Sequence, residues 1–208
     1  MSVERILKLF LTFSVAIFFL LINVNIIALL PSTYSKQVEN LKIDEITNGD
    51  KILISDKLFK IINFGSSGNL VLRNGKYAFS ERELAHLKDV AGIFKIIRII
   101  CIVSLIITVL IIVNLVKKGV KFASCFIYGS LLTLAFGIII AFTFDSSFIL
   151  FHILSFDNDL WLLPQTALLI NIFPQNFFFH SFITVIFLSV SELLIIYFVA
   201  SNCFKERK

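Results

Sequence analysis

The sequence contains little glycine and proline, 8 and 3 residues among 208, and its three cysteines form no Cys-x-x-Cys pair. Cys101, Cys125 and Cys203 all lie within or at the end of apolar runs, which argues against an extracellular disulfide framework. The metal-binding pattern His-Glu-x-x-His is missing, so no metal site and no cofactor are indicated. There is also no internal repeat and no low-complexity tract. These absences exclude a disulfide scaffold, a zinc hydrolase of that kind and a repeat protein.

Long apolar runs are the main feature that the sequence does have. The chain is 58% hydrophobic and its mean hydropathy is +0.93, whereas a soluble domain is about 45–50% apolar. About 20 apolar residues cross a bilayer, and four runs approach or exceed that length: residues 6–30, 99–116, 122–142 and 182–200. The sequence therefore predicts an α-helical membrane protein with four transmembrane helices. The first run is too long for a signal peptide and lacks a small-x-small site, so we expect it to be retained.

Lysine and arginine beside these runs predict the orientation. The loop 143–181 has no lysine or arginine, and the loop 31–94 has charges of both signs. By the positive-inside rule, both termini are expected in the cytoplasm and both long loops outside. The net charge of +5 is then a topology signal and does not indicate nucleic acid. The basic residues that flank the runs are Arg5, Lys8, Lys117, Lys118, Lys121, Lys205, Arg207 and Lys208.

The first long loop, 31–80, is expected to form a small extracytoplasmic module of mixed α/β structure. Residues 51–55 and 58–64 are short apolar-rich runs that indicate strands. The pair Asn74 and Gly75 predicts a hairpin with a type I′ turn. Ser80 and Glu83 then predict a capping box, which begins one long helix over 81–116 that includes the second span.

The rest of the chain divides in the same way. We expect a cytoplasmic turn and the third span over 117–142, and the fourth span with a cytoplasmic tail over 181–208. Between them, the apolar segments of 143–180 are each too short to span, which predicts an outer loop of interfacial helices.

All three histidines, His86, His152 and His180, lie in the two outer loops. On a helix, Arg82, Glu83 and Asp89 share a face with His86, so a carboxylate could orient one ring nitrogen and leave the other free as a base. The competing interpretation is a solvated surface histidine. His180 lies at the outer end of the fourth span, where an interfacial position explains it.

His152 lies in an aromatic segment with Phe148, Phe156 and, further on, Trp161. These rings could form a substrate floor at the membrane interface, or His152 could simply bond to the neighbouring backbone and Trp161 anchor the interface. Asp157 directly follows Phe156 and could support the site or cap a helix. Arg98 is a further substrate-contacting candidate, since it is expected near the interface, where long side chains snorkel.

One carboxyl, Glu192, is expected near the middle of the fourth span. Charged groups there are costly and often functional. Bonding to Ser189 or Ser191, or packing against Asn114, would also explain it, so we assign it no catalytic role.

Two stretches resemble the lipoprotein intramolecular transacylases of Gram-positive bacteria. Residues 79–90 contain the pattern Glu-x-x-His-Leu-x-Asp-Val. Residues 151–178 contain Phe-His, then Phe-Asp-Asn-Asp-Leu-Trp-Leu-Leu, then Pro-Gln-Asn-Phe-Phe. The four spans and two outer loops match the same family, and the module 31–78 matches in size and place.

The resemblance implies a multi-pass enzyme of the bacterial cell membrane, with its active site on the outer face. Its substrate would be a diacylated lipoprotein, with membrane lipid as its surroundings. An acyl chain would move from the glyceryl lipid to the α-amino group of the lipidated cysteine. His86 and His152 would be the catalytic pair, with His86 as base and His152 as acid, or the reverse.

Two other functions fit the residues alone. A non-enzymatic membrane assembly subunit would need neither histidine. A haem-binding membrane protein would use both as axial ligands. The oligomeric state is open.

Overall fold

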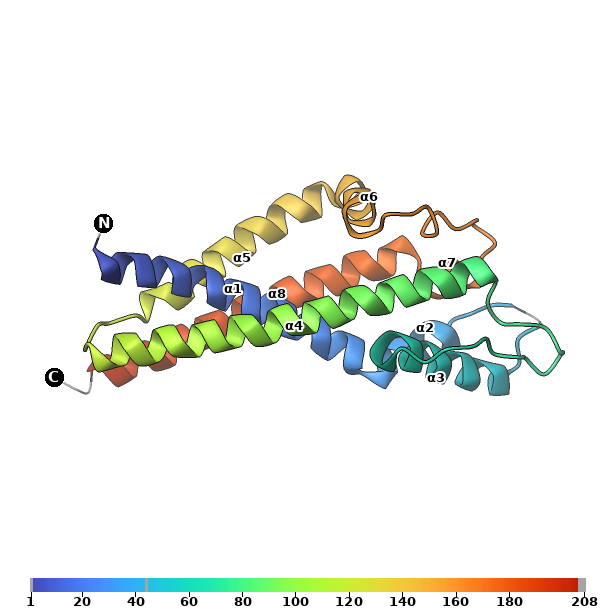
Figure 1. The fold of residues 1–208 in the computed structure, drawn as a ribbon, viewed down its shortest axis with the longest axis horizontal. Coiled ribbons are helices and arrows are strands. Elements are labelled where there is room, and N and C mark those ends of the chain that lie inside the picture. Colours follow the sequence, from blue (N-terminus) through green and yellow to red (C-terminus); the bar gives the residue numbers. More distant parts are fainter. Residues whose placement is uncertain (1, 44, 206–208) are drawn as a thin grey trace. The chain divides into compact units, whose positions relative to one another are not determined.

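The computed structural model describes residues 2–43 and 45–205, and most of them are helical (Figure 1). Arg207 and Lys208 of the predicted basic tail lie outside the described residues. The described helices, in chain order, are α1 Val3–Leu29, α2 Pro31–Glu39, α3 Asn48–Phe64, α4 Glu81–Lys117, α5 Ser124–Phe142, α6 Phe144–Ser155, α7 Leu168–Ile172 and α8 Gln175–Lys205.

Four of these helices, α1, α4, α5 and α8, are long and apolar enough to cross a membrane, which confirms the predicted spans. The expected long helix is present as α4, unbroken in Figure 1. The helix that contains the fourth span, α8, begins at Gln175, within the segment predicted as an outer loop of interfacial helices, and Pro174 directly precedes it.

The chain forms two compact units, which we describe separately. The bundle unit comprises Met1–Val24, Ile97–Thr143 and Phe182–Lys208. The site unit comprises Asn25–Ile96 and Phe144–Ser181.

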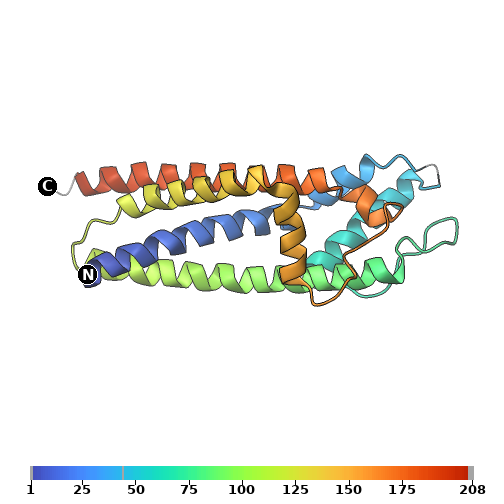
Figure 2. The ribbon, with the colours of Figure 1, turned by 90° about the horizontal axis from the view of Figure 1, so that it is seen from above.

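In the bundle unit, α1 contacts the other three spanning helices, and Figure 2 shows it between α4 and α8. The hydroxyl of Ser14 donates to the carbonyl oxygen of Ser104 at 2.9 Å on α4. The amide of Asn23 donates to Glu192 at 2.8 Å on α8. At Gly129 on α5, a Cβ would lie 3.0 Å from Val15. Small residues therefore allow the close helix approach that packing within lipid requires.

In the site unit, α2 and α3 pack together, and the predicted strands at 51–55 and 58–64 are wrong. Both runs lie in α3, whose first turn has a capping box between Thr47 and Asp50. The Thr47 hydroxyl, and then the backbone N–H of Arg73, lower the pKa of Asp50. Ile54, Leu58, Ile61 and Ile62 of α3 are buried at helical spacing in the core of this unit.

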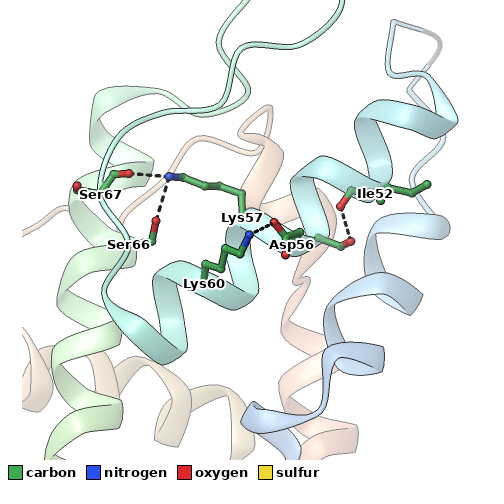
Figure 3. A network of polar contacts seen from close by, with 7 residues as sticks. Ile52, Asp56, Lys57, Lys60, Ser66 and Ser67 are labelled. Atoms are coloured by element: carbon green, nitrogen blue, oxygen red, sulfur yellow. Dashed lines mark hydrogen bonds and ion pairs between the residues drawn. The ribbon is translucent and has the colours of Figure 1, made fainter.

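α3 ends at Gly65, which adopts a left-handed conformation with φ +65°. The next residues are held back onto the helix. Lys57 donates to the carbonyl oxygen of Ser67 at 2.6 Å and lies 3.4 Å from the hydroxyl of Ser66 (Figure 3). These contacts hold the first residues of the loop between α3 and α4 against α3.

The predicted hairpin is present in a reduced form, as one antiparallel bridge between Val71 and Tyr77. The type I′ turn is wrong, since among the described residues only glycines have positive φ. Gly75 has φ +79° and donates its N–H to the carbonyl oxygen of Leu72. A type I turn followed by a left-handed glycine gives this three-residue loop. The described part of the module is thus helical with one bridge, without the expected strands.

Candidate functional site

The first turn of α4 is built as the sequence predicts. Glu83 Oε2 accepts hydrogen bonds from the backbone N–H and the hydroxyl of Ser80, both at 2.8 Å, and the Ser80 hydroxyl accepts from the N–H of Glu83. The other carboxylate oxygen of Glu83, Oε1, accepts a hydrogen bond from the backbone N–H of Leu169, at the start of α7, at 2.8 Å. Both oxygens of Glu83 thus have partners other than the ring of His86. Glu83 instead joins two distant segments.

His86 follows one turn later and precedes the apolar run of α4. Its residue surface is only 8% exposed, and the ring of Phe156 packs edge-on against it at 5.2 Å. Its Nδ1 is buried without a hydrogen-bond partner among the described residues. Burial, and to a smaller extent the neighbouring His152, lower the pKa of His86 to about 4, while Asp89 opposes the change. His86 is therefore uncharged at neutral pH.

His152 lies near the end of α6. Its Nδ1 is 2.7 Å from the carbonyl oxygen of Phe148, an atom that can only accept. This contact places the ring hydrogen on Nδ1 and leaves Nε2 with its lone pair in the neutral ring. The rings of Phe148, Phe151, Phe156 and Trp161 lie 4.4, 5.5, 5.7 and 5.0 Å away.

The two imidazoles come together, as expected. The ring centres of His86 and His152 are 6.2 Å apart and the planes are inclined by 31°. Two imidazoles at this distance, one buried and neutral, can act on opposite sides of one reacting group.

The polar residues beside His86 hold the segment after α6. Arg82 donates to the carbonyl oxygen of Asp159. Asp89 accepts from the side-chain amide of Asn158 at 3.0 Å, a residue that the sequence analysis did not select. Its position between two aspartates in a polar break was the available signal. Asp157 is exposed.

The remaining candidates lie elsewhere. Arg98 is on α4 in the bundle unit. His180 is exposed, and its Nδ1 lies 2.7 Å from the carbonyl oxygen of Asn176. Glu192 accepts from Asn23, whose amide also donates to Ser189 at 3.1 Å. Ser189, an expected partner of Glu192, is joined to it through Asn23.

The fold and this site define a multi-pass helical membrane protein with a pair of imidazoles that aromatic rings contact. A model of the lipoprotein intramolecular transacylase family, Lit, matches residues 9–178. The chain belongs to this family.

Solved structures agree in fold. The membrane-integral lipoprotein intramolecular transacylase Lit of Bacillus cereus is 23% identical, with a TM-score of 0.79 over 98% of this chain and 97% of that one. Structures of two variants of that protein, each with one histidine replaced by arginine or alanine, have TM-scores of 0.78. An uncharacterized protein of Aquifex aeolicus is 32% identical over 151 residues, 73% of this chain. The match spans 66% of that relative's length, just under two thirds.

Proposed function

We propose that the protein moves an acyl chain from the glyceryl lipid of a diacylated lipoprotein to the α-amino group of the lipidated N-terminal cysteine, giving the lyso-form lipoprotein. The observation that carries this proposal is the pair of imidazoles 6.2 Å apart on α4 and α6. Family membership supports the type of reaction, and the pair supplies groups that can move the one proton that the reaction displaces.

The reaction balances without any further reactant. The amine nitrogen attacks the ester carbonyl carbon, a carbon–nitrogen bond forms, and the bond from that carbon to the glyceryl oxygen breaks. The amine loses one proton and the glyceryl oxygen gains one. Since an α-amino group titrates at about 7.7–8.0, much of it is protonated at neutral pH. A base beside it therefore favours the attacking form.

We assign the base to His152 and the supporting donor to His86, the reverse of the first assignment made from the sequence. The contact between Nδ1 of His152 and Phe148 leaves Nε2 free to take the amine proton. The same nitrogen then returns this proton to the glyceryl oxygen. His86, held neutral by burial, donates an N–H hydrogen bond to the oxygen that becomes negative.

The residues around the two histidines also orient the substrate and exclude water. Both reacting groups belong to one substrate molecule, and holding them together can supply about 7–11 kcal/mol of the barrier. The rings of Phe148, Phe156 and Trp161 around His152 support the exclusion of water, the competing acceptor. We propose that this site lies at the outer face of the bacterial membrane, since Lys117, at the other end of α4, begins the basic turn.

The test is mass spectrometry of a reporter lipoprotein from a host without such an enzyme. With the wild-type protein, we expect the second acyl chain on the amine nitrogen. His86→Ala and His152→Ala should each lower the rate of transfer by at least about 10²-fold, the range for a lost acid or base. His180→Ala is the matched control, because it removes an exposed histidine outside the pair, and it should transfer normally.

Two outcomes would contradict the proposal. The chain could stay on glycerol whether or not the wild-type protein is present, which rejects the reaction. Alternatively, both histidine variants could transfer at the wild-type rate while being present at equal amounts, which rejects the pair and favours a non-enzymatic role.

A further inference from the structure

The segment from residue 156 to 169, which we call the strap, has no regular helix until α7 begins at Leu168. It nevertheless contains one wall of the site. Trp161 lies midway along it, with its ring 5.0 Å from the ring of His152. Phe156, at its start, lies against both histidines. The position of these rings therefore depends on what fastens the strap.

Among the described residues, three side-chain hydrogen bonds join the strap to the first turns of α4. Two are exposed: Arg82 with the carbonyl oxygen of Asp159, and Asn158 with Asp89. Water competes with both. The third is buried: Glu83 is only 4% exposed, and its Oε1 accepts from the N–H of Leu169. A charged acceptor that is left unpaired in a buried place is far more costly than an exposed one.

We propose that Glu83 is a positioning residue, which fastens the strap to the turn before His86 and so holds Trp161 and the ring of His152 opposite that histidine. The capping box with Ser80 fixes one carboxylate oxygen, so the other points in one direction only. The first turn of α4 thereby fixes the position of His86 and, through the strap, the position of Trp161 beside His152.

The test uses the intrinsic fluorescence of the full-length protein in detergent micelles. Trp161 is the single tryptophan in the 208 residues, so its emission reports the strap alone. Glu83→Ala should raise the acrylamide quenching constant and shorten the fluorescence anisotropy decay. Glu83→Gln should restore most of the wild-type behaviour, because the amide oxygen can still accept from Leu169. If Glu83→Ala fails to fold, Glu83→Leu, with a side chain of similar size and no acceptor, replaces it.

Asp50 provides the matched control. It is 1% exposed, forms the same capping box with Thr47, and accepts from the backbone N–H of Arg73 at 3.0 Å. Asp50→Ala therefore removes the same kind of fastening in the same unit, away from the histidines. We expect its Trp161 quenching to match the wild type. Equal quenching changes in the Asp50 and Glu83 variants would overturn the proposal, because they would reflect general loosening.

A kinetic measurement extends the test and rests on the proposed function. Glu83→Ala should lower kcat by about 10²-fold with a smaller change in KM, as expected when reacting groups are misplaced by about 1 Å. Asp50→Ala should keep the wild-type kcat at a temperature where both variants are folded. Unchanged quenching in the Glu83 variants overturns the inference. An inactive wild-type protein overturns the proposed function, and the fluorescence result then tests the role of Glu83 in holding the strap independently.

Discussion

Replacing His86 with phenylalanine should remove a loss of stability that acid causes in the wild type. Burial lowers the pKa of His86 from 6.5 to about 4 in the folded protein. Between these values the unfolded chain binds a proton that the folded chain does not. Stability is therefore complete above about pH 6.5 and falls as the pH drops towards 4. Phenylalanine binds no proton and can keep the edge-on contact with Phe156.

The magnitude follows from the two pKa values. Each pH unit between them corresponds to about 1.4 kcal/mol, so complete burial would give roughly 3 kcal/mol at low pH. Relaxation of the folded protein around the charged ring reduces this to about 1–2 kcal/mol. For a chain of this length, we expect the melting temperature to fall by about 3–6 °C more in the wild type than in the variant.

The assay is thermal unfolding in detergent at about pH 7.5, above the range between the two pKa values, and at about pH 4.5, within that range. All carboxylates are shared by the two proteins, so the difference between them isolates His86. His180→Gln controls for the loss of a histidine as such and should follow the wild type. An equal fall of the melting temperature in His86→Phe and the wild type would refute the reasoning.

Two packing predictions concern the stability of the helices, measured by the same unfolding assay. Gly137→Ala should destabilise by about 1–3 kcal/mol, because a Cβ there would lie 2.6 Å from Cγ2 of Ile186; Ile186→Ala should relieve this. Gly92→Ala is the matched change in open space and should stabilise by about 0.5–1 kcal/mol, so equal effects would contradict the packing argument. Asn23→Leu and Glu192→Leu should show a coupling energy of about 0.5–3 kcal/mol in a double-mutant cycle, and strictly additive effects would show that the bond contributes nothing.

The membrane frame was predictable because it depends on one strong effect. Hydrocarbon requires long apolar helices, and four runs of the sequence meet that requirement. The start of α4 was predictable as well, since Ser80 and Glu83 have the spacing of a capping box and the structure forms it.

α3 was predicted as two strands because each of its two short apolar runs, taken alone, has the length and composition of a strand. Thr47 and Asp50 have the same spacing as Ser80 and Glu83, and they mark a helix start. The exposed Ile52 and Leu53 obscured the helical period of the buried residues behind them. Reading the capping residues first would have corrected the prediction.

The pairing of His86 with His152 was predictable only through the resemblance, since the two lie in different loops. The fastening role of Glu83 was not visible in the sequence. Its partner is the backbone N–H of Leu169. Every residue except proline has this group, so the amino acid at position 169 does not indicate the contact. Reasoning from side chains therefore directed Glu83 towards the nearest histidine.

The bonds of Asn23 affect how the chain assembles during synthesis. α1 is made first, yet the partners of this buried amide, Ser189 and Glu192, are 166 and 169 residues further along. Until α8 has entered the bilayer, the amide lacks these two partners and keeps its bond to the carbonyl oxygen of Phe19 in its own helix. An unmet polar group in hydrocarbon favours any available partner. Nascent chains stalled before residue 189 should thus be more exposed to membrane chaperones and proteases than chains in which α8 has been inserted.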